Sequence, residues 1–167
     1  MDDQTSQVLY ASREGVHCLR FVGDIRYALA PSVNRFVDEL FEAEAPKEFV
    51  IDLTQTRGID STSLGVLARI ATRMQEHAGP RVTIVSTRHD ITEILLTMGF
   101  DEVFDIVTEP PDVPAAKALP VEEADRNSLA RTVVEAHRIL MSLNEYNREL
   151  FRDLVAVFER ENGKQAS

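Results

Sequence analysis

The sequence has 167 residues, of which 44% are hydrophobic and 28% charged, and its net charge is −10. This length suits one domain of average size plus an appendage. Residues 1–125 carry 11 Lys and Arg against 22 Asp and Glu, whereas residues 126–167 carry 7 against 6. Such an acidic domain repels phosphate backbones, so we expect no nucleic-acid binding. No apolar run approaches the roughly 20 residues that span a membrane, and the N-terminus lacks the features of a signal peptide, so we expect a cytoplasmic protein without membrane contact.

The N-terminal part of the chain predicts a β-hairpin. The segments Gln7 to Arg13 and Val16 to Val22 are rich in β-formers and flank the turn residues Glu14-Gly15. Gly23-Asp24 then predicts a turn. The single cysteine, Cys18, lies in the second apolar strand, where we expect a buried small side chain rather than a reactive thiol.

The next two elements are a helix and a buried strand. Pro31 to Glu42 carries a helical stripe of apolar residues, at Val33, Phe36, Val37, Leu40 and Phe41. Pro31 suits the first turn of a helix, and Pro46 ends the helical pattern. Phe49 to Leu53 is a nearly continuous apolar run, which is typical of a central strand.

A hydroxyl cluster, Asp60-Ser61-Thr62-Ser63, then precedes an apolar periodic run that ends near Gly79-Pro80. This pattern indicates the N-terminus of a helix. A helix N-terminus carries partial positive charge and free N–H groups, which favour an anion. The residues alone leave two interpretations open: Asp60 or Ser61 is only a helix cap, or Ser61 is an exposed hydroxyl to which charge can be added.

Strands and helices continue to alternate after this helix. Arg81 to Ser86 predicts a strand, His89-Asp90 begins a helix that runs through Met98, and Val103 to Val107 predicts a last short strand. Such alternation implies parallel strands joined by right-handed crossovers. Because the N-terminal hairpin adds an antiparallel pair, we predict an α/β fold with a mixed β-sheet.

The C-terminal third has a different composition. Residues 108–125 hold four of the seven prolines and predict a linker, and residues 126–162 predict a helical extension. Apolar residues recur there at alternating steps of four and three, as in a heptad repeat from Leu129 to Val157. Asn147 is its polar position, and such a residue can fix the register of a coiled coil. Two alternatives stay open. Either the extension packs back on its own domain, as one helix or as two broken helices, or residues 126–160 pair two chains in a homodimer.

The sequence offers no catalytic constellation. It has no Gly-x-Ser-x-Gly elbow and no phosphate-binding glycine loop with a lysine. The histidines His17, His77, His89 and His137 are scattered singly, so we expect no metal site and identify no general base for Ser61. We therefore expect a protein that is not an enzyme and needs no cofactor.

Four pieces of the sequence, in order, resemble the STAS domain family of anti-sigma factor antagonists. Asp-Ser-Thr-Ser-Leu-Gly from Asp60 is similar to the family's phosphorylation motif, Asp-Ser-Ser/Thr-x-Leu-Gly, and Phe21 to Ile25 resembles its second strand and following turn. Val82 to Val85 resembles its fourth strand, and Ile94 to Phe100 its Leu-Leu-x-x-x-Gly-Leu helix ending. The resemblance implies a STAS-like domain over residues 1–107, with helices mainly on one side of the sheet.

The resemblance also implies a function. In this family the hydroxyl directly after the motif Asp is the phosphate acceptor, which is Ser61 here, with Thr62 and Ser63 as weaker candidates. The expected function is that of an anti-sigma factor antagonist, a bacterial partner-switching protein without enzymatic activity. Its unphosphorylated form would bind an anti-sigma factor or a serine kinase of the GHKL type, and a PP2C-type phosphatase would reset the switch.

We expect the partner-binding residues around the acceptor to be Asp24, Arg26, Asp60, Ser61, Thr62, Ser63 and Leu64. Arg26 departs from the family, many of whose members have an acidic residue or threonine there. An arginine beside the acceptor would attract a phosphate, which changes how a kinase recognises the site. The alternative function is a scaffold or sensor module that oligomerises through the C-terminal helix, with Ser61 incidental.

Overall fold

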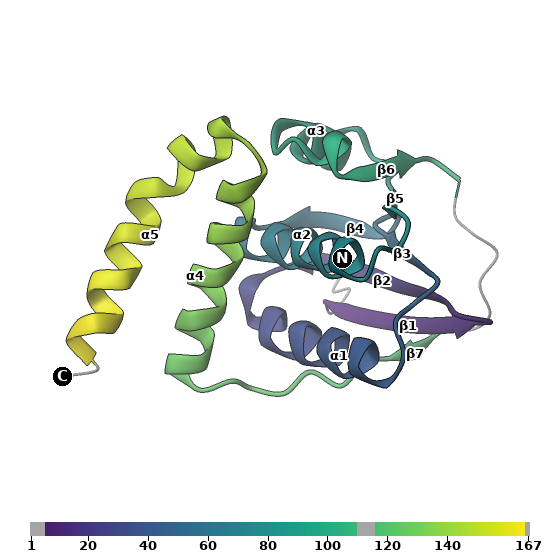
Figure 1. Cartoon of the computed structure of the whole chain (residues 1–167), viewed down its shortest axis with the longest axis horizontal. Coiled ribbons are helices and arrows are strands. Elements are labelled where there is room, and N and C mark those ends of the chain that lie inside the picture. The colour runs from purple at the N-terminus through teal and green to yellow at the C-terminus, as the bar shows by residue number, and fades with distance from the viewer. Residues whose placement is uncertain (1–5, 110–115, 166–167) are drawn as a thin grey trace, which may run out of the picture.

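The computed structural model describes residues 6–109 and 116–165, with side chains through Glu161. Seven strands form its β-sheet: β1 Gln7–Arg13, β2 Val16–Ile25, β3 Glu48–Asp52, β4 Thr56–Ile59, β5 Val82–Val85, β6 Phe104–Val107 and β7 Lys117–Ala118. The helices are η1 Tyr27–Leu29, α1 Ala30–Ala43, α2 Ser61–Glu76, α3 His89–Thr97, η2 Phe100–Glu102, α4 Arg126–Leu143 and α5 Glu145–Gln165. Figure 1 shows α1 and α2 side by side over the sheet, α4 across them, and α5 beyond α4.

The sheet is mixed, as predicted. Its order is β6-β5-β3-β2-β1-β7, and β4 pairs with the end of β2. Neighbours from β2 to β6 are parallel, whereas β1 is antiparallel to both β2 and β7. The predicted α/β fold is therefore confirmed: the parallel strands are joined by helices and the hairpin supplies the antiparallel edge.

The main hydrophobic core lies on one face of the sheet, as predicted. Leu19, Phe21 and Ile51 point from the strands toward the helices and are almost fully buried. Their neighbours Cys18 and Val50 belong to a small separate cluster, because successive side chains of a strand point to opposite faces. Burial is the main cause that raises the pKa of the Cys18 thiol to about 11, so at neutral pH this thiol is protonated.

The structure corrects the prediction for the residues between β2 and α2. The expected turn at Gly23-Asp24 is wrong, because β2 continues to Ile25 with a shift of register between these two residues. The expected loop after β3 contains the short strand β4, parallel to β2. Thr56, fully buried, fixes β4 in place through a hydrogen bond from its Oγ1 to the carbonyl oxygen of Phe21 at 2.7 Å.

The C-terminal extension folds back on the domain. The chain from residue 116 adds β7 to the edge of the sheet and buries Leu119, and α4 then packs on α2. The heptad-type repeat is interrupted at Asn144, whose extended backbone separates α4 from α5. In this single chain, the structure corresponds to the alternative of two helices that pack back on their own domain. Residues 110–115 of the predicted linker lie outside the described residues.

Asn147, which we interpreted as a register-setting position of a coiled coil, has a different role. It is fully buried, and its Nδ2 donates to the carbonyl oxygens of Met98 at 2.9 Å and Leu140 at 3.0 Å. One side chain therefore joins α5 to the end of α4 and to the turn after α3. The interpretation as a register residue was wrong because the polar atom meets backbone carbonyls of the same chain.

The first prediction concerns the α2–sheet contact. Leu67 is fully buried, so Leu67→Ala should lower the free energy of unfolding by about 2–5 kcal/mol through lost apolar contact and a residual cavity. Urea titration measures the change. Leu96→Ala is the control, since Leu96 is 45% exposed on α3 and should cost far less. Equal losses for the two variants would contradict the packing described here.

The second prediction concerns Asn147. Asn147→Ala removes both donated hydrogen bonds and leaves the Leu140 carbonyl oxygen without this partner, which should cost about 1–3 kcal/mol. Asn127→Ala on the exposed side of α4 is the matched control and should change stability little. Thermal unfolding of the full chain checks both, and an Asn147 variant as stable as its control would refute the assigned role.

Candidate functional site

The loop after β2 and the start of α2 are joined by Asp60. Its Oδ1 accepts from the amide of Ser63 at 2.9 Å, which caps α2, and its Oδ2 accepts from the amide of Tyr27 at 2.7 Å. Its own amide donates to the carbonyl oxygen of Ile25 at 3.1 Å. A carboxylate at a helix N-terminus is favoured by both the free N–H groups and the helix dipole. Asp60 therefore holds the predicted site residues of the two segments side by side.

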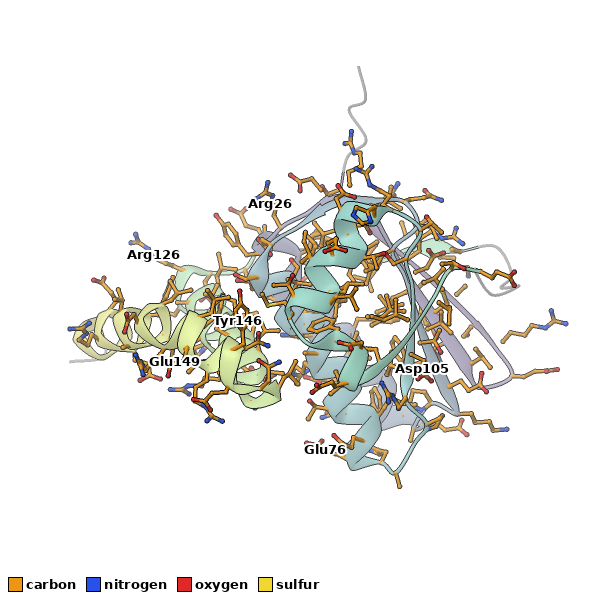
Figure 2. All side chains as sticks on the ribbon, turned by 90° about the horizontal axis from the view of Figure 1, so that it is seen from above. Arg26, Glu76, Asp105, Arg126, Tyr146 and Glu149 are labelled. Atoms are coloured by element: carbon orange, nitrogen blue, oxygen red, sulfur yellow. The ribbon has the colours of Figure 1, made fainter. Side chains whose placement is uncertain are left out.

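Arg26 and Asp24 lie next to this cap on the surface. Arg26 Nε contacts Asp24 Oδ2 at 2.9 Å, and the two side chains are 64% and 47% exposed. The ion pair partly neutralises the arginine, which reduces its predicted attraction for a phosphate. A surface pair of this kind contributes about 0–1 kcal/mol, so Arg26 can exchange partners at little cost. Figure 2 shows Arg26 at the same edge of the molecule as Arg126 of α4.

Ser61 is the first residue of α2 and is half-buried. Its Oγ lies 2.8 Å from Nε2 of His137, a residue of α4 that is only 2% exposed. The other ring nitrogen, Nδ1, lies 2.7 Å from the carbonyl oxygen of Val133. Because a carbonyl oxygen only accepts, Nδ1 carries the proton in the neutral ring and Nε2 accepts from the Ser61 hydroxyl.

His137 was missed in the sequence analysis. The sequence shows four scattered histidines and indicates no base near Ser61. The two residues are 76 positions apart, and the heptad pattern of α4 gave no sign that His137 faces α2. Only the packing of α4 on α2 brings the imidazole to the hydroxyl.

The other predicted partner-binding residues are less accessible than Asp24 and Arg26. Thr62, Ser63 and Leu64 are 5%, 4% and 3% exposed. Leu64 packs in the main core, and Ser63 Oγ donates to the carbonyl oxygen of Ile25 at 3.5 Å. In this arrangement the surface that a partner can reach is formed by Asp24, Arg26 and the half-buried Asp60 and Ser61.

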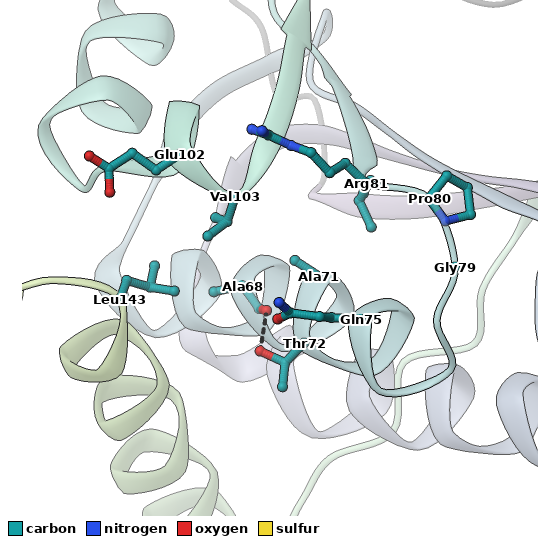
Figure 3. Close-up of a pocket in the computed structure, with 11 residues that line it drawn as sticks. Ala68, Ala71, Thr72, Gln75, Gly79, Pro80, Arg81, Glu102, Val103 and Leu143 are labelled. Atoms are coloured by element: carbon teal, nitrogen blue, oxygen red, sulfur yellow. Dashed lines mark hydrogen bonds between the residues drawn. The ribbon is translucent and has the colours of Figure 1, made fainter.

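Ser61 opens into a cleft of about 530 Å³ between α4 and α5. Its walls are mainly apolar and include Leu129, Val133, Leu154 and Phe158, and Ser61, Thr62 and His137 also line it. A second pocket, of about 200 Å³, lies farther along α2 (Figure 3). There Leu143 of α4 and Val103 line a space closed by the turn at Gly79-Pro80, and the pocket does not include the residues of the predicted site.

Metal sites and membrane-spanning helices can also be assessed for the described residues. Among residues 6–109 and 116–165, no group of three or more His, Cys, Asp or Glu side chains is placed to hold a metal ion. Within the same ranges, no helix combines the length and apolar character needed to cross a membrane.

Comparisons with known proteins agree with this architecture. The chain superimposes on an anti-sigma factor antagonist from Mycobacterium paratuberculosis with a TM-score of 0.53 and 20% identity, covering 65% of this chain and 90% of that one. It superimposes on the unphosphorylated anti-sigma factor antagonist SpoIIAA with a TM-score of 0.50 and 12% identity, covering 64% and 90%. The comparison with curated proteins found no match. The family model of the STAS domain matches residues 7–112, well over half of the sequence, and the chain therefore belongs to the STAS domain family.

Proposed function

We propose that this protein is an anti-sigma factor antagonist whose partner binding is controlled by phosphorylation of Ser61. The observation that carries the proposal is the position of Ser61. It is the first residue of α2, directly after the Asp60 cap, and its hydroxyl reaches a surface cleft. Two further points support it: in the family motif that Asp60 to Gly65 resembles, the hydroxyl directly after the Asp is the phosphate acceptor, and the chain shares its fold with anti-sigma factor antagonists.

Phosphate at this position suits both the helix and the proposed switch. A phosphoserine carries about −1.5 to −2 charge at neutral pH, and the N-terminus of α2 tolerates an anion. The fold should therefore survive the modification. A partner that covers Ser61 would have to desolvate the phosphate. Two arginines lie near Ser61 and would compensate only part of this charge: Arg26, which already pairs with Asp24, and Arg126, which lines the same cleft.

The partners follow from this proposal. The unphosphorylated protein would bind an anti-sigma factor or a serine kinase of the GHKL type, and a PP2C-type phosphatase would remove the phosphate. ATP and metal ions would be bound by those partners. The strong negative charge of residues 1–125 favours a partner whose binding surface is basic away from the position that faces Ser61.

The third prediction tests the switch. Ser61→Asp should weaken binding of the anti-sigma factor by a few hundredfold, about 3–4 kcal/mol, whereas Ser61→Ala should bind. The two variants serve as baits that recover the partner, which mass spectrometry identifies. Mass spectrometry of the wild-type protein locates the phosphate. Calorimetry measures the affinity of each variant for the partner. Ser12→Asp adds the same charge on an exposed position of β1 and should leave affinity almost unchanged. A confirmed phosphate on Ser61 with unchanged affinity for the Asp variant would refute the electrostatic mechanism.

The Ser61–His137 pair invites comparison with a nucleophile and its base, and we propose that it is not catalytic. The imidazole is almost completely buried, and its second nitrogen is bound to a backbone carbonyl instead of the carboxylate that commonly orients a catalytic histidine. An activated-serine probe should therefore leave Ser61 unlabelled in the folded protein.

One observation favours the second candidate function, a scaffold that oligomerises through its C-terminal helices. Four residues on one side of α5 remain substantially exposed, Tyr146, Leu150, Leu154 and Val157. They recur at steps of four and three and so form an apolar stripe. Figure 2 shows α5 on the side of the molecule opposite the β1–β2 strands, where a second chain has access.

The fourth prediction tests this candidate. If the stripe pairs two chains, light scattering should show a dimer at micromolar concentration, and Leu150→Glu should convert it to a monomer because a charge would be buried in the contact. Leu96→Glu, a change at a similarly exposed leucine of α3, should leave the dimer intact. A wild-type protein that is monomeric throughout this range would refute the scaffold function.

A further inference from the structure

Helix α4 covers the outer face of α2 in very close contact. A Cβ atom added at Gly65 of α2 would overlap the carbonyl oxygen of Ala136 and would lie 2.5 Å from the Ala136 Cβ. Two helices approach so closely only where both positions are small. Gly65 and Ala136 therefore form a matched pair, and the face of α2 that follows Ser61 is shaped to receive a helix.

Two further interactions join α4 to α2: a hydrogen bond at Ser61, where α2 begins, and ion pairs of Arg69 farther along α2. His137, the residue after Ala136, accepts the hydrogen bond of Ser61, and the Phe151 ring of α5 packs edge-on against the imidazole with 5.0 Å between centroids. Arg69 of α2 contacts Glu135 of α4 at 3.0 Å and Asp38 of α1 at 2.8 Å. The helix α4 is thus held on α2 by close packing, one hydrogen bond and one shared arginine.

The two C-terminal helices pack on each other, and the Asn147 side chain also joins α5 to the Met98 carbonyl oxygen. Phe151 and Val155 of α5 are buried, and Arg138 of α4 forms an ion pair with Glu159 of α5. Leu154, Phe158 and Glu161 of α5 face α4 across the cleft described above. Lifting α4 from α2 would therefore expose the start of α2 while α4 and α5 stay paired.

We propose that α4 competes with the partner for the same face of α2. The partner binds by inserting its own amphipathic helix at the place where α4 now lies. That helix carries a small residue at the position of Ala136. This inference rests on the proposed function, because it concerns how partner access to the Ser61 site is regulated. The apparent Kd rises as the open fraction falls, so a face that is open about 1% of the time binds about 100-fold more weakly.

A direct test changes α4 and leaves the docking face of α2 unaltered. In the full-length protein, Ala136→Glu introduces a bulky charged side chain where only a methyl group fits against Gly65. Ala156→Glu is the matched control, since Ala156 lies on the exposed side of α5. The probe is a fluorescein-labelled peptide of residues 125–161, which stands in for the partner helix, and fluorescence anisotropy measures its binding.

We expect the peptide to bind the Ala136→Glu protein at least about tenfold more tightly than the wild type or the Ala156→Glu control. Hydrogen exchange of the same samples should show faster exchange in α4 with unchanged protection in β3. Equal peptide affinity for all three proteins would overturn the inference, and so would α4 amides of the Ala136→Glu protein that stay as protected as in the wild type.

Ala136→Glu could disturb the whole fold, and faster hydrogen exchange in β3 would reveal this. A second variant keeps the test decisive in that case. Glu135→Arg places a cation against Arg69 at an exposed position, so the domain should fold while α4 is loosened. Peptide binding should strengthen by roughly threefold to tenfold, and no gain would overturn the inference. No phosphate takes part in these measurements. Failure of the Ser61 switch and failure of the competition by α4 are therefore separate results.

Discussion

The arrangement of this protein depends on the burial of α2 from two sides. Leu67 packs against the sheet below, and Gly65 admits the backbone of α4 above. A side chain larger than hydrogen at position 65 would hold α4 away from Arg69 and Ser61. One glycine therefore determines both how the C-terminal helices dock and how much of the Ser61 site is open to the surroundings.

Local patterns in the sequence were sufficient to predict most of the fold. Three signals each lie within a few residues of sequence: the apolar run of β3, the apolar stripe of α1 and the Asp60 cap of α2. The structure contains all three elements. The strand β4 escaped prediction because its four residues, with Gly58 among them, lack an apolar alternation. It exists because buried Thr56 pairs with β2, a contact over 35 positions that no local pattern records.

Only the part of the candidate site that comes from the end of β2 and the start of α2 could be predicted from the sequence. Asp24, Arg26 and Asp60 meet because the ends of β2 and β4 adjoin the start of α2, which follows from the order of the strands. The partner of Ser61 could not be predicted in the same way, because His137 reaches it through the packing of one helix on another. The heptad-type repeat of the extension was compatible with either self-packing or pairing. The polar Asn147 was misleading because its Nδ2 donates to backbone carbonyls of the same chain, not to a second helix.

If Ser61 is phosphorylated and α4 can leave α2, as proposed, the two changes involve the same residue and therefore influence each other. In the closed arrangement its hydroxyl donates to His137, and a phosphorylated oxygen has no proton to donate. Modification would thus remove one of the contacts that hold α4 on α2 and place a dianion beside a buried ring. By the reciprocity of coupled equilibria, whatever lifts α4 would in turn favour the modified form of Ser61. Phosphorylation would then have two opposed effects on partner binding: it would loosen α4 and so open the docking face, and it would place there a charge that the partner must desolvate.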